Sequence, residues 1–410
     1  MANTLLTPTM VTRRALAILH QKLVFLRTIS RQYDDQFARS GAKIGNTLKI
    51  RKPNQYTVRT GLVMSAQDTV EESLDLVVST VKGVDVNFDS VELTLDIDDF
   101  AKRILEPAMA RLASEVEAVV LENVYLDVYN HVGTGASNPN TFLQVLNANV
   151  KLSQGLAPDT TNRHLLLDPV IMATMVDALK GFFHRASDVE RAFSEAYYGR
   201  AAGLNWWETT AVPNHTNGTR TDTTPVINTS TGITSGSASL TVTAAGNALV
   251  YETGDVFTID DVFAVNPETK RRYSHLQQFT VTADATSTAG GAVTLTVSPT
   301  PTTSGARQNV ELVSAGAGKA ILNLTGGGSG AADEVFAQQL AYHRDAFTFV
   351  TADLEVPRNT EASRQVYDGI SLRYVREFDI INSKHPARFD VLFGYKTIRP
   401  EWATRLAKQS

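Results

Sequence analysis

An abrupt change of composition in the middle of the chain most constrains its fold. Between about Pro213 and Ala332 a Thr-, Ser- and Gly-rich segment carries 14 charged residues in 120, whereas 20% of the 410-residue chain is charged. The sequence before this segment is charge-rich and helical in pattern, and the sequence after it resumes as strands. A self-contained module inserted into a host domain produces such a pattern. We therefore expect a host domain that is interrupted by a small β module.

The inserted segment contains short runs in which apolar and polar residues alternate. Clusters of Gly and Pro separate these runs, as expected for strands joined by turns. The pattern predicts a small antiparallel barrel. Its clearest strand candidates are 239–243, 255–259, 279–281 and 293–297.

The N-terminal part of the host predicts a helix, a strand and a long excursion. Apolar residues recur with helical spacing from Val11 to about Ser30. Thr47–Arg51 is a short strand candidate that Pro53 ends. The polar stretch 54–80 predicts a two-stranded excursion that is too thin to have a core of its own.

The next segment predicts a bent strand followed by a long helix. Alternation over 84–97 reverses its phase near Asp89-Ser90, which predicts a bulge or bend. Asp98 and Asp99 stand where a helix N-cap is expected, and the helix extends to about Tyr129. Pro107 lies inside it and should kink it. Shorter helices and strands follow, and the whole predicts an α+β host. The helices are expected near 141–154, 169–181 and 187–197, and the strands near 165–167, 206–207, 345–356, 370–381 and 388–398.

Residue types that carry chemistry form no convincing constellation. The chain has no cysteine, and its eight histidines show no paired spacing that suits a transition metal. Asp96, Asp98 and Asp99 lack the glycine and distal glutamate of a calcium loop, so helix capping explains them better. Gly326–Gly330 suits a flexible linker better than a phosphate cradle, and no Gly-X-Ser-X-Gly motif is present. We expect neither enzymatic activity nor a cofactor, metal or catalytic residue.

The sequence also predicts no membrane association. No stretch approaches about 18 consecutive apolar residues, and the first residues do not resemble a secretory signal.

Charge is strongly segregated near the N-terminus. Residues 1–60 carry eleven Lys or Arg and two Asp, a net charge of +9, while residues 61–130 carry fifteen acidic and four basic residues, a net charge of −11. Adjacent blocks of opposite sign can attract within a chain or between copies of it. Two interpretations stay open, namely two solvated faces or an assembly contact. The isolated cluster Lys270–Tyr273 is better explained as a solvated hairpin tip than as a nucleic-acid site.

The elements in this order resemble the P22-like coat proteins of tailed bacteriophages, a branch of the HK97-fold major capsid proteins. The resemblance covers essentially the whole chain. No single motif is diagnostic, and the combination of strand, acidic cap, long helix and β insert carries the similarity. The matching segments are 46–53, 61–72, 91–100 with Arg103, 112–117, 213–218 and 254–257.

The resemblance implies an α+β HK97-like fold with a defined layout. That layout is an N-terminal arm (1–50), an extended E-loop (51–82), a P-domain strand and spine helix (83–130), an A-domain (131–212), an inserted β-barrel domain (213–332), and return strands with a C-terminal tail (333–410).

The implied function is a major capsid protein that self-assembles into an icosahedral shell around double-stranded DNA. The implied partners are further copies of the chain in hexamers and pentamers, a scaffolding protein, a portal, and packaged DNA that is contacted weakly. We expect the protein in the virion capsid, after assembly in the cytoplasm of the bacterial host. Candidate contacts between subunits are Arg13, Arg14, Lys22, Gln67, Asp68, Glu71 and Glu72.

One feature departs from some members of the wider fold, which weld subunits through an E-loop lysine and an asparagine of a neighbour. Here the proposed loop has lysines only at its base, Lys52 and Lys82. We therefore predict no covalent cross-links.

Two alternatives remain open at this point. A cargo-enclosing nanocompartment shell would use the same fold without DNA. A carbohydrate- or receptor-binding module, of a different functional class, could use Trp206, Trp207 and the Thr-rich strands.

Overall fold

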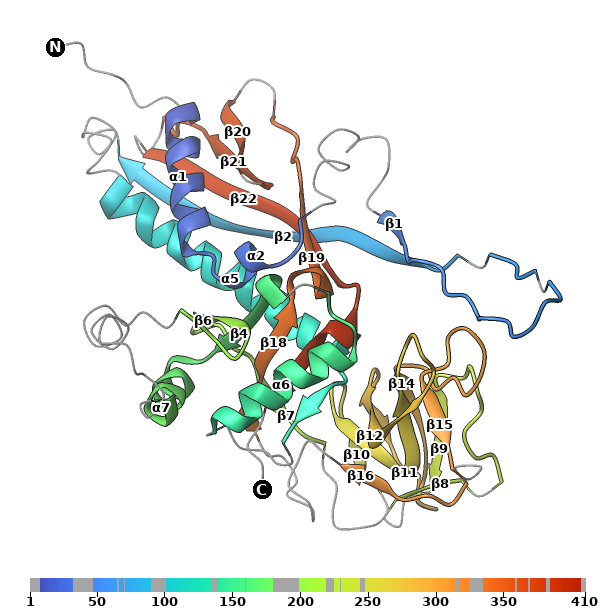
Figure 1. Cartoon of the computed structure of the whole chain (residues 1–410). Helices are drawn as coiled ribbons and strands as arrows, with labels where there is room; N and C mark the ends of the chain where they lie inside the picture. The colour runs from blue at the N-terminus through green and yellow to red at the C-terminus, as the bar shows by residue number, and fades with distance from the viewer. Residues whose placement is uncertain are drawn as a thin grey trace. The chain divides into compact units, whose positions relative to one another are not determined.

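A computed structural model of the chain has two compact units (Figure 1). Unit 1 comprises residues 1–52, 73–120 and 347–398, and unit 2 comprises residues 53–72, 121–346 and 399–410. The structure describes residues 8–31, 47–89 apart from 65 and 70, 101–133, 139, 141–179 apart from 159, 199–218, 225–243 apart from 229, 248–313, 317–323, 335–357, 360–380 apart from 368, and 384–406.

Unit 1 is built on an antiparallel six-stranded sheet. The order is β1 (Thr47–Arg51), β2 (Ser73–Asp89), β22 (Lys384–Thr397), β21 (Ile370–Arg376) and β20 (Glu361–Tyr367), and β19 (Phe347–Ala352) also pairs with β22. Strand β2 runs without interruption through residues 82 and 83, where the sequence suggested a boundary between the E-loop and the P-domain. Its described pairing with β22 has a register shift between Val78 and Thr80. The bend expected near Asp89-Ser90 falls at the end of the described residues, because 90–100 lie outside them.

The N-terminal helix ends earlier than its apolar pattern predicts. Helix α1 (Pro8–Lys22) stops, and the chain resumes as a single turn, α2 (Phe25–Thr28). The apolar residues of the predicted face are nevertheless buried in both helices, so the choice of face is correct. The break has a tertiary cause, because an acceptor from another helix binds the backbone amides at residues 24–26.

The long helix changes type near its proline. A π-helical turn (Ala101–Leu105) leads into α5 (Glu106–Val124) and a 3₁₀ turn (Tyr125–Asp127). Pro107 has no N–H, and its ring would clash with the carbonyl of Arg103 in a regular α-helix, so the irregularity lies where the kink is expected. The proposed cap at Asp98 and Asp99 lies outside the described residues.

The host part of unit 2 is a mixed sheet covered by helices. The strand order is β3 (His131–Val132), β23 (Ala403–Leu406), β18 (Gln339–His343), β4 (Arg163–Leu167), β6 (Leu204–Glu208) and β5 (Arg200–Ala201). Helices α6 (Phe142–Gln154) and α7 (Pro169–Leu179) contribute to one apolar core with this sheet. The helix expected at 187–197 lies outside the described residues.

The inserted segment forms a closed antiparallel barrel in unit 2. Its strand order is β15 (Val310–Leu312), β11 (Val256–Val265), β12 (Arg272–Val281), β14 (Ala292–Ser298), β9 (Ser239–Thr243) and β8 (Val226–Ile227), and β16 (Ile321–Asn323) also pairs with β11. Backbone bonds from Ile227 N to Lys319 O (2.9 Å) and from Ile321 N to Pro225 O (2.8 Å) join β8 to the segment around β16 and close the ring. Phe257 and Phe279 stack in its core with ring centroids 5.9 Å apart. The alternating pattern of the sequence predicted this barrel.

The two chain segments that flank the barrel pair with each other. Strands β7 (Asn214–Thr216) and β17 (Val335–Ala337) form a short antiparallel ladder. A smaller ladder, β10 (Val250–Tyr251) with β13 (Ala285–Thr286), lies within the inserted segment. The chain therefore enters and leaves the barrel side by side, as an insertion requires.

Candidate functional site

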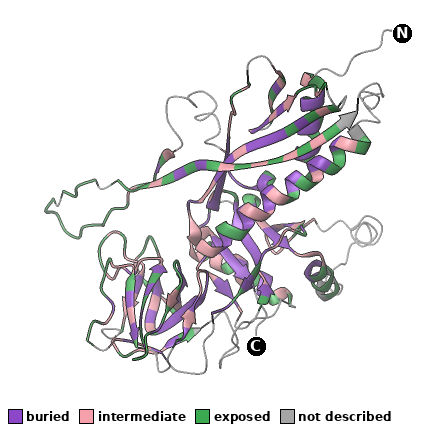
Figure 2. Ribbon diagram, turned by 180° about the vertical axis from the view of Figure 1, so that it is seen from behind, coloured by how far each residue is buried: buried purple, intermediate pink, exposed green. Residues whose placement is uncertain are grey.

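The loop between β1 and β2 exposes a cluster of large apolar side chains. Leu62 is 99% exposed, Val63 85% and Met64 80%. In Figure 2 the described part of this loop is mostly green, the colour of exposed residues. The pairing of β1 with β2 ends at Arg51 and Ser73, and the described residues between them form no strand. Contiguous exposed apolar residues mark interaction surfaces in soluble proteins. We call residues 62–64 the apolar tip.

The sequence-predicted contact residues of this loop have different environments. Gln67 spans the loop, since its amide accepts from Thr57 N (2.8 Å) and donates to Thr57 O (2.6 Å). Asp68 and Glu71 are exposed. Glu72 forms an ion pair with Arg307 of the inserted barrel. Gln67 and Glu72 therefore have partners within the chain, and a role between subunits stays a prediction for all four.

The three basic candidates lie on the exposed surface of α1, which we call its basic face. All three are exposed: Arg13 and Arg14 lie on the side opposite the buried apolar residues, and Lys22 lies at the C-terminal end of the helix. Lys22 lies in the last turn, where a cation interacts favourably with the helix dipole. This face is available for a partner of opposite charge.

Part of the acidic block is neutralised within unit 1. The Glu115 carboxylate lies 2.9 Å from Lys82 Nζ and 3.6 Å from an Arg111 nitrogen. The hydrogen bond and charge of Lys82, followed by the charge of Arg111, lower the pKa of Glu115. The sequence contained both signs of charge but did not predict this pairing.

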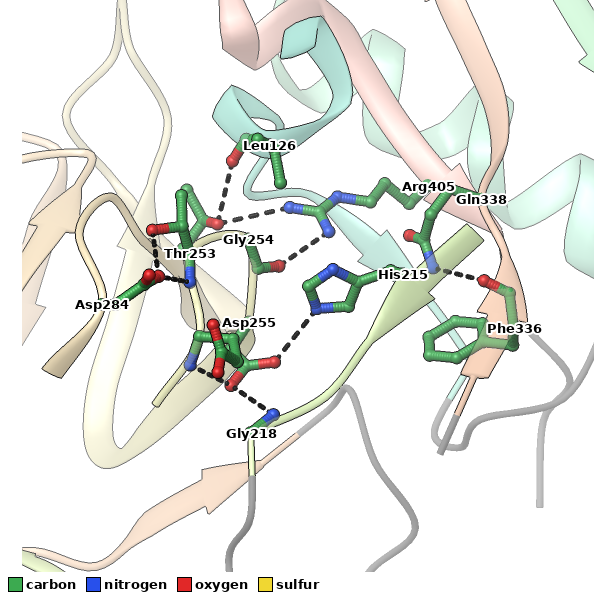
Figure 3. A network of polar contacts seen from close by, with 12 residues as sticks. Leu126, His215, Gly218, Thr253, Gly254, Asp255, Asp284, Phe336, Gln338 and Arg405 are labelled. Carbon is green, nitrogen blue, oxygen red and sulfur yellow. Dashed lines mark hydrogen bonds and ion pairs between the residues drawn. The ribbon is translucent and has the colours of Figure 1, made fainter. Parts of the chain in front are cut away.

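A buried polar cluster connects the inserted barrel to the host part of unit 2 (Figure 3). We call Tyr125, His215, Asp255, Thr280 and Arg405 the polar joint. Arg405 of β23 is fully buried and donates to Val128 O (2.8 Å), Gly254 O (2.7 Å) and Thr280 Oγ1 (3.2 Å). Burial lowers the pKa of Arg405 to about 10, so the guanidinium stays charged at neutral pH. Its charge lies 5.3 Å from the Tyr125 ring centroid, a favourable cation–π arrangement.

The other half of the polar joint is a buried histidine between a hydroxyl and a carboxylate. His215 Nε2 lies 3.0 Å from Asp255 Oδ1, and His215 Nδ1 lies 3.2 Å from the Tyr125 hydroxyl. Asp255 Oδ2 also accepts from the amides of Gly218 (3.3 Å) and Glu252 (3.0 Å). Such a constellation could serve acid–base chemistry only if a substrate reached it. His215 and Asp255 are almost completely buried, so the cluster acts as structure.

Further hydrogen bonds strengthen the same connection. The Gln278 amide of the barrel bonds reciprocally with the backbone of His131, at 2.9 and 2.8 Å. Thr280 Oγ1 donates to Leu126 O at 3.1 Å. Directional bonds to buried groups fix the barrel to the host at one orientation. Sequence reasoning missed this cluster as a site, although the matching segments 213–218 and 254–257 contain two of its members.

Two kinds of feature were sought in the part of the chain that the structure describes, namely clusters of metal-ligating side chains and helices that could span a membrane. No group of three or more His, Cys, Asp or Glu side chains there could hold a metal ion. The described helices are also too short or too polar to cross a bilayer.

Comparison with known proteins identifies the family. A model of the P22 coat protein (gene protein 5) matches residues 2–405. The chain belongs to the P22 coat protein family. It is therefore a major capsid protein, a subunit of a bacteriophage shell. Its α+β architecture with an inserted antiparallel barrel is the one that the resemblance to the P22-like branch of the HK97 fold implied.

Several solved structures from bacteriophages are similar to this P22-family coat protein. A structure from Mycobacterium phage Che8 is 11% identical, with a TM-score of 0.46, and the match covers 94% of this chain and 90% of that chain. The capsid structure of the cyanophage P-SCSP1u is 10% identical, with a TM-score of 0.42 and coverage of 89% and 84%. No curated protein matches the coat protein in a sequence comparison.

Proposed function

We propose that this coat protein assembles as hexamers and pentamers into an icosahedral shell around double-stranded DNA, in the cytoplasm of the bacterial host. Membership of the P22 coat protein family supports the shell, and the apolar tip is the structural observation that carries the proposal. A subunit that stayed alone would leave Leu62, Val63 and Met64 in water. A second copy of the chain is the occupant that a self-assembling shell provides.

The apolar tip can supply a useful part of the assembly energy. Burial of one large apolar side chain is worth about 1.5–3 kcal/mol. Three such side chains on every subunit, each buried on a neighbour, would add up over the shell. Because the entropy lost on ordering the loop opposes this gain, the net free energy of each contact is small, and assembly depends on many contacts.

We also propose the domain roles that the resemblance implies. Residues 1–50 serve as the N-terminal arm, 51–82 as the E-loop, 83–130 as the P-domain strand and spine helix, 131–212 as the A-domain, 213–332 as the inserted domain and 333–410 as the return strands and tail. The continuity of β2 through residue 82 suggests that the E-loop and the P-domain share a strand rather than a hinge.

The remaining partners follow from charge and from the needs of a shell. The net charge of −5 favours weak contact with packaged DNA, which supports packaging and release. The exposed basic face of α1 suits the acidic 61–130 block of a neighbouring subunit or DNA at the inner surface. A scaffolding protein and a portal complete the proposed set.

The tryptophan pair Trp206 and Trp207 does not support the alternative that the chain is a binding module. Trp206 is buried and donates its indole N–H to Ala201 O (3.0 Å), while Trp207 donates to His164 Nδ1 (3.0 Å). Both indole donors are therefore engaged inside the subunit. A nanocompartment shell would differ from the proposal by lacking DNA.

Negative-stain microscopy of the expressed protein, alone and with a candidate scaffolding protein, tests the proposal. We expect capsomers or closed shells. Particles from infected cells should in addition protect double-stranded DNA from nuclease. A protein that stays monomeric under both conditions contradicts self-assembly, and shells that hold protein cargo instead of DNA favour the nanocompartment.

A further inference from the structure

The long helix carries a buried carboxyl group that no charged partner pairs directly in the described contacts. Glu117 of α5 is only 3% exposed. Its Oε1 accepts from the backbone amides of Val24 (2.6 Å), Phe25 and Leu26 (3.3 Å). Three consecutive N–H groups of the N-terminal segment thus converge on one oxygen of a helix that lies more than 90 residues away in sequence. All of these residues belong to unit 1.

These three amides lie at the break between α1 and α2. The first amides of a helix have no acceptor in the preceding turn, and Val24 provides no side-chain cap. Glu117 supplies the missing acceptor. It therefore stabilises the break itself and fixes the direction in which the chain leaves α1.

Other contacts bind the same segment without setting this geometry. Phe25 packs against Phe347 with ring centroids 5.9 Å apart. Ser30 exchanges backbone bonds with Phe347 (3.2 Å) and Phe349 (3.1 Å). The apolar contact is non-directional, and the backbone bonds of Ser30 fix the end of the segment, whereas the three N–H bonds to Glu117 fix the position of the break itself.

We propose that Glu117 is a proton-sensitive latch, which holds the N-terminal helices α1 and α2 in place on the long helix α5. The latch itself consists of contacts within one subunit. Its consequence for assembly rests on the proposed shell function, because the position of α1 decides where Arg13, Arg14 and Lys22 are presented to a neighbour.

The charged and titratable groups around Glu117 determine the direction of its response to pH. Burial raises the pKa of Glu117 to about 7, although the three backbone amides and the charge of Arg27 act to lower it. On α1, Lys22 is exposed, and His20 packs edge-on against Tyr367. Strand β19 has no ionisable side chain. Within α5, Glu115 is engaged by Lys82 and Arg111.

The sign of the effect follows from linkage. When the N-terminal helices detach, Glu117 meets water and its pKa returns to the ordinary value of 4.5. The docked state therefore binds a proton more tightly than the detached state. Docking is strongest below pH 4.5, weakens as the pH rises towards 7, and stays at the weaker level above 7. The docking constant should fall on the order of a hundredfold over this interval.

Hydrogen exchange of residues 8–28 in the full-length soluble subunit, corrected for the intrinsic rate at each pH, measures docking directly. In the unmodified protein, protection should fall between pH 5 and 7 and then stay constant. Glu117→Gln keeps an acceptor oxygen and cannot ionise, so its protection should be high at every pH. Glu117→Leu removes the acceptor, so its protection should be low at every pH. Glu122→Gln, an exposed position on the same helix, should behave as the unmodified protein.

Two results would overturn the latch. The first is a Glu117→Gln variant whose protection depends on pH as in the unmodified protein, since another group would then titrate. The second is a Glu117→Leu variant that is fully protected. If Glu117→Leu does not fold, the pH profile of Glu117→Gln still decides. Because the measurement uses unassembled subunits, its outcome is independent of whether shells form.

Discussion

At the scale of single residues, the main feature is a buried cation held without a carboxylate bonded directly to it. Arg405 donates to two backbone carbonyls and one hydroxyl, so its charge is solvated by oriented dipoles of the chain. Burial of an uncompensated charge would be very costly. The arrangement is tolerated because these acceptors and the face of the Tyr125 ring surround the guanidinium with partial negative charge.

Replacement of Arg405 by Met should lower the free energy of unfolding by about 3 kcal/mol, because the carbonyls of Val128 and Gly254 lose their donor. Arg405→Lys keeps the charge with fewer donors. Its free energy of unfolding should lie between those of the unmodified protein and Arg405→Met. Urea denaturation of the soluble subunit measures both. Arg111→Met, at an exposed pair of α5, is the control and should change stability by about 0.5 kcal/mol or less. Equal midpoints for Arg405→Met and the unmodified protein would show that the polar joint adds no stability.

At the scale of elements, the loop between β1 and β2 differs most from its sequence pattern. A two-stranded excursion was expected over 54–80, but the described pairing is limited to 47–51 with 73–77. The intervening residues have few large apolar anchors, so a ladder there would bury little surface. The element therefore presents side chains instead of forming a sheet of its own.

Replacement of the apolar tip by polar residues should separate folding from assembly. In Leu62→Ser/Val63→Ser/Met64→Gln, the Tm of the subunit should be unchanged, because these side chains are exposed in it. Shell yield, measured by microscopy and sedimentation, should fall at least about tenfold, the equivalent of a loss of 1.4 kcal/mol per contact. Leu62→Met/Val63→Ile/Met64→Leu keeps the apolar surface and should assemble normally. Full assembly of the polar variant would show that the apolar tip is not part of the interface between subunits.

The basic face of α1 allows a second element-scale test. Neutralisation of Arg13, Arg14 and Lys22 together by Gln should impair assembly without loss of the folded subunit, because all three are exposed. In the unmodified protein, assembly should weaken with added salt if this face meets an acidic partner. Arg13→Lys/Arg14→Lys preserves the charge and serves as the control. Normal particles from the neutralised variant would count against the contact.

At the scale of the whole molecule, the chain combines a stable insert with surfaces that need further copies. The barrel has its own apolar core, and the polar joint fixes it to the host part of unit 2. The apolar tip and the basic face of α1 contribute little to that core. Stability and assembly are thus carried by different parts of the chain.

Mature particles should contain no covalently linked subunits. Lys82 at the base of the loop is engaged by Glu115, and the centre of the loop offers no lysine. A denaturing gel of particles should therefore show one band at 44.6 kDa. A ladder of higher bands would contradict this prediction.

Much of the fold follows from local pattern. Periodicity predicted the face that α1 buries, the antiparallel barrel, and most helices and strands of the host, because a repeat of 3.6 or 2 residues decides which side chains share a face. Composition marked the inserted segment. The family resemblance predicted the shell function.

Hydrogen bonds between residues that are far apart in sequence were revealed only by the tertiary structure. Periodicity continues through residues 23–24, yet the helix breaks there because Glu117, 93 residues from Val24, accepts its amide. Arg405 lies in the predicted C-terminal tail, yet in the structure it belongs to β23 and bonds to Val128, 277 residues away. A local pattern records whether a residue is apolar or polar, but not which distant group will satisfy a buried donor or acceptor. Only the folded chain brings those groups within hydrogen-bonding distance.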